Sequence, residues 1–367
     1  MFSADAFRDP ELAARLAGRL RELLARLARP VAVMEVCGTH TVAIARSGLE
    51  GLLPKGLRLV SGPGCPVCVT PQGEIERAVA AAKLPGVALV TFGDMLRVPA
   101  RGGSLEAARS AGADVRMAYS PREALDAARA DPGRQLVFVG VGFETTIPGF
   151  AAAVLEARAA GVRNFSVLSS FRLVPPALAA VVAAGPALDG FILPGHVSAI
   201  LGTAPYGLLP KAGRAAVVAG FEPLDVLLAI EMLLEQLVAG RPRVEIGYRR
   251  AVRPEGNPEA RRLMHEVFEP ADARWRGLGT LPASGLAFRR EFGDFDAARR
   301  FALAAPEVGE PAGCRCGEVL TGRAAPGECP LFGSGCTPED PVGPCMVSSE
   351  GSCAARWKYG PEGAARR

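Results

Sequence analysis

The nine cysteines of this chain lie in two groups, and this distribution constrains its fold and chemistry more than any other feature. Three lie near the amino terminus, at Cys37, Cys65 and Cys68. The other six lie close to the carboxyl terminus, at Cys314, Cys316, Cys329, Cys336, Cys345 and Cys353. Thiolates are soft metal ligands and redox-active nucleophiles. Two groups separated by a long cysteine-free stretch therefore predict metal and electron chemistry.

Charge and hydropathy argue against two classes of partner. The 42 basic and 38 acidic residues give a net charge of +4, without a Lys/Arg run, which argues against nucleic-acid binding. The uncharged stretches 173–188 and 190–210 are broken by Pro and Gly, so we interpret them as buried elements instead of membrane spans. Arg8 and Asp9 interrupt any apolar leader, so we expect a cytoplasmic protein. In that reducing compartment, metal or catalytic roles of cysteine outweigh disulfides.

Residues 1–29 are predicted to carry an N-terminal amphipathic helix. Asp9 has the character of a helix cap and Pro10 that of the first helical residue. Leucines then follow at helical spacing until Pro30, which ends the helix, at Leu12, Leu16, Leu20, Leu23 and Leu27.

Short apolar runs, each ending in Gly or a polar turn, alternate with Ala-rich helical patterns. The runs are residues 31–36, 57–61, 87–92, 136–141, 165–169, 191–193 and 215–219. This alternation predicts an α/β fold with parallel sheets and helices on both faces. Because the runs are too many for one small sheet, we expect two parallel-sheet α/β lobes around a cleft, residues 30–125 and 126–248.

The alternation stops near residue 250, and residues 249–367 are predicted to form a separate helical and Cys-rich region. Residues 254–304 look helical and charged, whereas 311–360 are rich in Cys, Gly and Pro with little hydrophobic periodicity. Such a segment cannot bury enough apolar surface to fold alone, so it is expected to need a metal.

Reactive residues follow five of the predicted strands. In open α/β sheets, functional groups gather at the carboxyl ends of strands, so these residues are expected to share one cleft. They are Cys37 and His40, Cys65 and Cys68, Asp94, Glu144, and His196.

Two of these strand ends carry recognisable short motifs. Cys65-Pro66-Val67-Cys68 is a C-x-x-C motif, which could close a disulfide or form half of a zinc site. Residues 140–146 resemble a dinucleotide-binding loop but lack the third glycine, which argues against nucleotide binding. Glu144 in this loop is a candidate proton carrier or ligand partner.

The carboxyl-terminal cysteines have the spacing of a cluster or zinc site. Cys314, Cys329, Cys336 and Cys353 form C-x14-C-x6-C-x16-C, with Cys316 and Cys345 as additional thiols. Four thiolates without histidine fit either a [4Fe–4S] cluster or a four-cysteine zinc site, which the spacing does not separate. The C-x-x-C motif upstream slightly favours the cluster, because it gives an electron carrier a target.

Taken together, these motifs resemble the HypD family of [NiFe]-hydrogenase maturation factors, over nearly the whole chain. The resemblance lies in residues 37–41 (CGTHT), 62–68 (GPGCPVC), 142–146 (GFETT), 193–197 (LPGHV), 336–338 (CTP) and 343–351 (GPCMVSSEG).

The resemblance implies a redox-active scaffold, rather than a classical turnover enzyme, on which the Fe(CN)2CO unit of the hydrogenase is assembled. By this likeness Cys37 holds the iron, and Cys65 and Cys68 form a redox pair that also faces it. A [4Fe–4S] cluster on Cys314, Cys329, Cys336 and Cys353 supplies electrons, with Cys316 and Cys345 as alternate ligands.

The same likeness implies partners and further site residues. It implies a small HypC-type chaperone and a HypE-type cyanide donor, and we expect this chain alone to be a monomer. His40, Glu144 and His196 are expected to manage protons or bind the cyanide nitrogens. We also expect the helix that begins near Thr39 to lower the pKa of Cys37.

Two functions of other classes compete with this interpretation. A stand-alone iron–sulfur thiol–disulfide oxidoreductase would use the cluster and the C-x-x-C pair but leaves Cys37 without a role. A zinc-stabilised binding module would use no redox chemistry at all.

Overall fold

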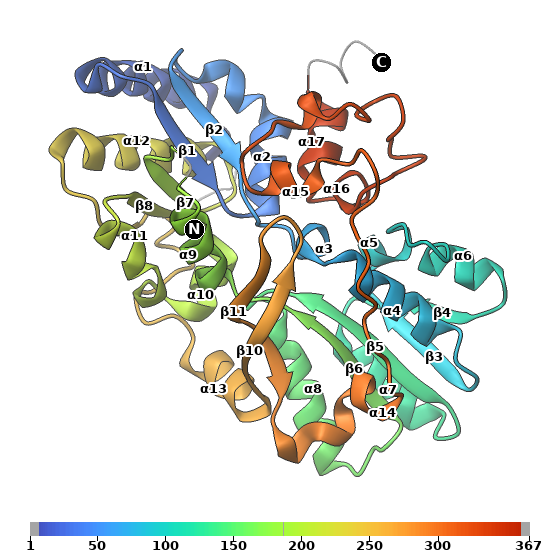
Figure 1. The fold of residues 1–367 in the computed structure, drawn as a ribbon. Coiled ribbons are helices and arrows are strands. Elements are labelled where there is room, and N and C mark those ends of the chain that lie inside the picture. The colour runs from blue at the N-terminus through green and yellow to red at the C-terminus, as the bar shows by residue number, and fades with distance from the viewer. Residues whose placement is uncertain (1–6, 186, 361–367) are drawn as a thin grey trace.

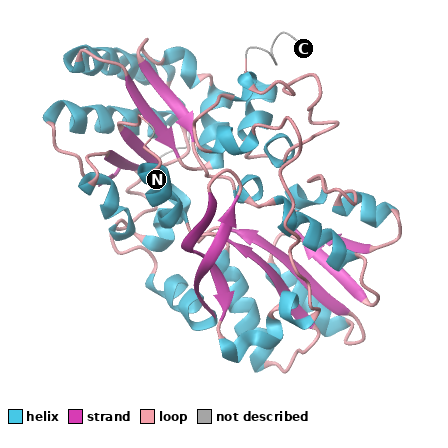
Figure 2. Cartoon of the chain, in the orientation of Figure 1, coloured by secondary structure: helices cyan, strands magenta, loops and turns pink. Residues whose placement is uncertain are grey.

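Two parallel sheets with flanking helices and a Cys-rich region make up the chain, as predicted (Figures 1 and 2). The computed structural model describes residues 7–185 and 187–360. The first six residues of the predicted N-terminal segment and the last seven of the predicted Cys-rich region lie outside the described residues.

The first sheet has five parallel strands in the order β2-β1-β7-β8-β9. Their bounds are β1 (Val31–Glu35), β2 (Leu57–Ser61), β7 (Gly190–Pro194), β8 (Ala215–Ala219) and β9 (Val244–Ile246). β1, β7 and β8 are buried along their whole length. Helices cover both faces, which is why these strands are almost entirely apolar in sequence.

The second sheet has four parallel strands in the order β4-β3-β5-β6. They are β3 (Val87–Thr91), β4 (Asp114–Met117), β5 (Gln135–Gly142) and β6 (Phe165–Phe171). β4 and β9 were not predicted. Both are short edge strands with little buried surface, so they lack the apolar run that marks the others.

The boundary expected between residues 125 and 126 does not separate the lobes. The chain leaves the first sheet after β2, builds the whole second sheet, and returns to pair β7 with β1. The first lobe is therefore discontinuous in sequence. Strands that are buried on both faces have similar apolar sequences in either sheet. Their order in the chain therefore does not show which sheet each strand belongs to.

The predicted N-terminal helix is confirmed as α1 (Pro10–Leu27). Asp9 caps it, because its Oδ1 accepts hydrogen bonds from the backbone N–H groups of Glu11 (2.8 Å) and Leu12 (3.2 Å). α1 packs against α12 (Pro223–Ala239), and the two helices cover one face of the first sheet.

Shorter helices connect the strands, and no described helix has both the length and the apolar character needed to cross a bilayer. The remaining helices before residue 250 are α2 (Gly38–Ser47), η2 (Leu49–Leu52), α3 (Pro66–Val69), α4 (Gln72–Ala82), α5 (Gly93–Leu96), α6 (Leu105–Ser110), α7 (Pro121–Ala130), α8 (Ile147–Ala159), α9 (Val174–Ala183), α10 (Gly195–Leu201), η3 (Ala204–Gly207) and α11 (Leu208–Lys211).

The expectation that residues 254–304 are helical is wrong over its central part. Only α13 (Pro258–Val267), η4 (Arg290–Phe295) and α14 (Ala297–Arg300) are helical there. Between them β10 (Phe268–Trp275) and β11 (Gly279–Phe288) form an antiparallel hairpin. Much of this hairpin is exposed. Its sequence is therefore rich in charged residues, as that of a solvent-exposed helix is, and this similarity explains the wrong prediction. The hairpin reaches from the second sheet toward the Cys-rich region (Figure 1).

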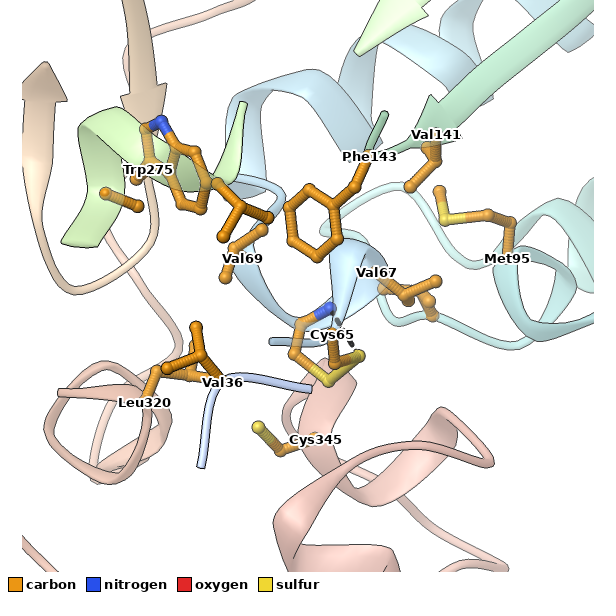
Figure 3. Close-up of a cluster of buried hydrophobic side chains, with 14 of the residues drawn as sticks. Val36, Cys65, Val67, Val69, Met95, Val141, Phe143, Trp275, Leu320 and Cys345 are labelled. Atoms are coloured by element: carbon orange, nitrogen blue, oxygen red, sulfur yellow. Dashed lines mark hydrogen bonds between the residues drawn. A yellow bond between two sulfur atoms is a disulfide. The ribbon is translucent and has the colours of Figure 1, made fainter. Parts of the chain in front are cut away.

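The Cys-rich region consists of short helices and loops that pack on the first lobe. They are α15 (Cys316–Leu320), η5 (Pro326–Glu328), α16 (Pro344–Val347) and α17 (Ser352–Tyr359). α17 contacts α2, while α15 and α16 contact α3. One apolar core joins both lobes, the hairpin and this region, and Figure 3 shows part of it.

Two loops at the carboxyl ends of β1 and β2 touch through their backbones. The N–H of Gly38 donates to the carbonyl of Gly64 at 3.0 Å, and a Cβ on Gly64 would overlap the backbone of Cys37. Only glycine leaves room for this approach, so Gly64 is what brings the Cys37 loop against the Cys65 loop.

Replacing Gly64 with Ala should separate these loops and lower the free energy of unfolding by about 1–3 kcal/mol, as overpacking does elsewhere. Urea unfolding measures this change. Gly18→Ala is the matched control, because nothing lies within 4 Å of its added Cβ inside α1. The control should gain about 0.5–1 kcal/mol from helix propensity. Equal effects of the two substitutions would show that the loop contact is not tight.

Candidate functional site

Cys37 lies two residues after β1 and directly before α2, where a buried carboxyl group holds its backbone. Glu35 is 2% exposed, and its Oε2 accepts a hydrogen bond from the Cys37 N–H at 3.1 Å. The Thr41 hydroxyl donates to the other oxygen of Glu35. Burial raises the pKa of Glu35 to about 8. The sequence analysis did not identify Glu35. An isolated acidic residue at the end of an apolar strand was the signal that could have indicated it.

A second carboxyl group reaches Cys37 from the Cys-rich region. Glu350 Oε1 accepts a hydrogen bond from the Thr39 hydroxyl at 2.6 Å, and its side chain lies against Gly38 so closely that a Cβ there would overlap it. Burial raises the pKa of Glu350. Glu350 lies within the 343–351 motif of the sequence, but its role as a neighbour of Cys37 was not foreseen.

The start of α2 does favour the Cys37 thiolate, through the backbone N–H of His40, but the expected net lowering of the Cys37 pKa is wrong. Cys37 is only 8% exposed, and burial, followed by the negative charge of Glu350, raises its pKa to about 12. Hydrogen bonds from the His40 backbone and Thr39 side chain oppose this shift but are weaker. The free thiol is therefore protonated at neutral pH, and a metal that binds it must displace a proton.

Cys65 and Cys68 form a disulfide at the start of α3, with their Cα atoms 5.2 Å apart. Both residues are buried, and Cys65 Sγ lies 3.3 Å from the hydroxyl of Ser348. That hydroxyl donates to Asp94 Oδ2 at 2.9 Å, as does the N–H of Ser349. Residues 348–350 of the Cys-rich region thus cover the strand ends, so the thiols are buried instead of lining an open cleft.

The two histidines of the predicted site share an aromatic neighbour. The Phe221 ring stacks on His40 and on His196, with centroid distances of 4.7 and 4.0 Å. His40 Nε2 lies 2.9 Å from the carbonyl oxygen of Gly220, which can only accept, so Nε2 carries the proton. Burial lowers the pKa of His40 to about 4. Its Nδ1 is a buried acceptor without a hydrogen-bond partner among the described residues.

Glu144 lies apart from these groups. Its Oε1 accepts a hydrogen bond from the N–H of Val174 at 2.9 Å, at the start of α9, while Oε2 is buried and unbonded within the described part of the chain. Burial raises the pKa of Glu144 to about 8. Buried Tyr206 lies within electrostatic reach of both Glu144 and Cys37. No hydrogen bond joins Glu144 to the other predicted site residues within the described part of the chain.

All six carboxyl-terminal cysteines line one small cavity. Apolar side chains complete its wall, and Gly343 keeps it open, because a Cβ there would lie 2.7 Å from the Sγ of Cys314. The lining residues include Cys314, Cys316, Cys329, Cys336, Cys345, Cys353, Val319, Leu331, Phe332 and Met346. Over residues 7–185 and 187–360, no three His, Cys, Asp or Glu side chains are already grouped to hold a metal ion. The donor type and apolar wall still fit a thiolate-bound cluster.

Two of the six cysteines form a close pair inside this cavity. Cys316 Sγ lies 2.9 Å from Cys345 Sγ, and both residues are buried. The hydrogen bond from Cys345 lowers the pKa of Cys316, and the charge of Arg276 lowers it further. This proximity suits a dithiol that can close a disulfide, although Cys345 is also hydrogen-bonded to Cys353.

The C-x-x-C helix lies beside this second pair. α3 contacts both α15, which begins at Cys316, and α16, which contains Cys345. Figure 3 shows the Cys345 side chain next to the disulfide of Cys65, within one apolar cluster. Cys37, the disulfide and the close thiol pair are therefore all buried and lie on segments that contact one another.

The negative charge of Glu350 should control the reactivity of the Cys37 thiol in iron-free protein. Because Glu350 raises the pKa of Cys37, Glu350→Gln should lower it and increase the thiolate population at any given pH. The rate of iodoacetamide alkylation at Cys37, followed by peptide mass spectrometry across alkaline pH, should then rise several-fold.

Thr39→Val is the matched control, since it removes the same hydrogen bond but leaves the Glu350 charge. Its alkylation rate should stay equal or fall, because the Thr39 hydroxyl lowers the pKa of Cys37. Identical pH–rate profiles in the wild type and both variants would contradict this electrostatic account.

Comparison with known proteins agrees with the motifs. The family described as "Hydrogenase formation hypA family" (HypD) matches residues 11–360. The hydrogenase expression/formation protein HupD of Azotobacter chroococcum mcd 1 is 49% identical over 97% of this chain and 96% of its own. The hydrogenase maturation factor HypD of Azotobacter vinelandii is 48% identical over the same shares, and that of Escherichia coli (strain K12) is 44% identical over 97% of both chains. This chain belongs to the HypD family of hydrogenase maturation factors.

Proposed function

We propose that this maturation factor is the scaffold on which the Fe(CN)2CO unit of a [NiFe] hydrogenase is assembled. One observation carries the proposal most strongly: the buried Cys37 lies on a loop that touches the loop of the Cys65–Cys68 disulfide. A single metal-binding thiol next to a redox-active pair is what ligand addition at a reducible iron requires. Membership of the HypD family supports hydrogenase maturation as the process served.

Cys37 is the proposed ligand of the iron, which is the cargo of this protein. Its thiol is protonated at neutral pH, so iron binding releases one proton. Glu350, bonded to Thr39 beside Cys37, is placed to receive that proton. Low exposure of Cys37 also keeps water from the iron and its ligands.

The cysteine pairs are proposed to keep the site reduced. Reduction of the Cys65–Cys68 disulfide breaks its S–S bond and takes up two electrons and two protons. Cys316 and Cys345 can supply them by thiol–disulfide exchange through a mixed disulfide, which leaves their own pair oxidised. A bound [4Fe–4S] cluster provides single electrons, and the neighbouring cavity has the thiols to hold one.

Four cysteines are proposed to bind that cluster: Cys314, Cys329, Cys336 and Cys353. All four line the cavity, and with Cys316 and Cys345 assigned to the exchanging pair these four are the thiols left for the cluster. Burial raises the pKa of Cys314 to about 12, so cluster binding, like iron binding, must displace protons.

The remaining site residues and partners complete the proposal. A HypC-type chaperone would share the iron with Cys37, a HypE-type protein would deliver cyanide, and one copy of this chain would serve both. His40 cannot donate from Nδ1, so it would accept a proton or hydrogen bond there. Exposed His196, stacked on Phe221, would present its imidazole to the arriving ligands or partner.

Replacing Cys37 with Ser should remove the cargo iron but keep the cluster. Protein co-produced with its HypC-type partner should lose the iron in excess of the cluster, while the brown chromophore and the unfolding midpoint stay unchanged. Metal analysis with visible absorption measures both. A stand-alone thiol–disulfide oxidoreductase, which the adjacent cysteine pairs also permit, would show the same iron content with and without the substitution.

Replacing single carboxyl-terminal cysteines should divide them into two classes. Cys314→Ala, Cys329→Ala, Cys336→Ala and Cys353→Ala should each lose most of the cluster iron, since each removes a ligand. Cys316→Ala and Cys345→Ala should retain it, because these residues are proposed to form the exchanging dithiol and not to bind the cluster. Full iron retention in Cys314→Ala together with loss in Cys316→Ala would instead make Cys316 the ligand.

A further inference from the structure

Two consecutive serines of the Cys-rich region, Ser348 and Ser349, bind the same carboxylate oxygen of the second lobe. Each hydroxyl donates a hydrogen bond of 2.9 Å to Oδ2 of Asp94, which belongs to α5. The backbone N–H of Ser349 donates to the same oxygen, also at 2.9 Å. Among the hydrogen bonds of these two serines in the described structure, only that of Ser348 continues to a cysteine, because its Oγ lies 3.3 Å from the Sγ of Cys65.

The hydroxyl group of Ser348 has its hydrogen directed away from this sulfur. The hydrogen is donated to Asp94, and the oxygen accepts a hydrogen bond from the N–H of Glu350 at 3.2 Å. A hydroxyl has one donor and two acceptor sites, so the site left toward Cys65 is an acceptor. The sulfur of a disulfide carries no hydrogen to donate. The surroundings of Ser348 therefore match a reduced Cys65, whose S–H can fill the remaining acceptor site.

These contacts lead from a buried sulfur to the surface of the protein. Cys65 is 3% exposed and Ser348 is 1% exposed, whereas Asp94 is half-buried and the neighbouring Ser349 is exposed. Opening or closing a disulfide moves two protons as well as two electrons. A sulfur that water does not reach needs protein groups to carry its proton, and the Ser348 hydroxyl and the Asp94 carboxylate are in hydrogen-bonding sequence from Cys65 outward.

We propose that Ser348 and Asp94 form a proton path that serves Cys65 each time the Cys65–Cys68 bond is opened or closed. The inference rests on the redox role given to this cysteine pair in the proposed function. Ser348 touches the reacting sulfur and is the catalytic residue of the path. Asp94 acts through Ser348 and is a positioning residue, which orients the hydroxyl and exchanges its proton with water.

The path balances the exchange in both directions. When the bond opens, an incoming dithiol gives up two electrons and two protons and becomes a disulfide, while Cys65 and Cys68 become thiols. The Cys65 thiolate takes the hydroxyl proton of Ser348, and Ser348 regains one from the carboxyl group of Asp94, which takes its proton from water. When the bond closes, the thiol proton passes to Ser348 as the hydroxyl proton moves to Asp94, which releases it to water.

The test is the rate of exchange in the full chain, purified with its bound metal. Reduced dithiothreitol opens the disulfide, and oxidised dithiothreitol closes it again. Acid quenching, alkylation and peptide mass spectrometry follow the reduced fraction of Cys65 and Cys68 over time. Ser348→Ala and Asp94→Ala should each slow both directions by roughly 100-fold, which is the lower end of what a positioned general acid or base contributes.

Ser349→Ala is the matched control. It removes a hydrogen bond of the same length to the same oxygen of Asp94 but leaves the contact between Ser348 and Cys65 in place. Both of its rates should stay near those of the wild type. The comparison of Ser348→Ala with Ser349→Ala decides the case even where Asp94→Ala fails to fold.

Formate separates the two members of the path. A small carboxylate can replace the side chain of Asp94 at its half-buried position, but it cannot replace the hydroxyl of Ser348. Added formate should therefore restore exchange in Asp94→Ala and leave Ser348→Ala slow, whereas chloride at the same concentration should restore neither. A slow Asp94→Ala variant that formate leaves slow would remove Asp94 from the path.

A purely structural role of Asp94 predicts a change of the opposite sign. Residues 348–350 cover the disulfide, so the loss of a mere anchor would expose the sulfurs and speed up exchange. Rates in Ser348→Ala at or above the wild-type rates, or an equal slowing in Ser349→Ala, would overturn the path and leave the redox role intact. A wild-type disulfide that dithiothreitol never opens in the folded protein would overturn the redox role and this inference with it.

Discussion

The contact between two loop backbones, where Gly64 lies against Cys37, is the constraint on which the rest of this site depends. β1 and β2 pair in parallel, so their carboxyl ends already lie side by side, but a side chain at residue 64 would push the loops apart. With glycine there, a lone thiol and a disulfide come together on two neighbouring strands. The proposed chemistry at Cys37 and the proposed electron supply both require this contact.

Burial gives the site its electrostatic character. Cys37, Glu35 and Glu350 are all withdrawn from water by the segment that contains α16 and α17, and each has a raised pKa for that reason. The raised pKa of Cys37 keeps its thiol protonated at neutral pH, so a metal that binds it must displace the proton. A buried cluster of protonatable ligands is therefore stable without metal, and it binds metal with release of protons.

Much of this arrangement could be predicted from the sequence, because parallel strands carry long apolar runs and their carboxyl ends hold the unusual residues. The cysteines, His40 and His196 were found in this way. Pairing order could not be predicted, so the return of β7 to β1 was missed. The Cys65–Ser348 and Cys316–Cys345 contacts were missed as well, since each depends on segments far apart in sequence. Glu35 was missed although its partner Cys37 lies only two residues away. The predicted direction of the Cys37 pKa shift was wrong, because the sequence does not show how deeply Cys37 is buried.

The infrared spectrum of this protein purified with its HypC-type partner tests the central claim most directly. Cyanide and carbon monoxide bound to iron absorb in a spectral region that is otherwise empty in proteins. If Cys37 carries the assembling unit, the wild-type complex shows both cyanide and carbonyl bands, and they disappear in the Cys37→Ser complex. Bands of undiminished intensity in that variant, or a wild-type complex that contains iron but shows no such bands, would contradict the account.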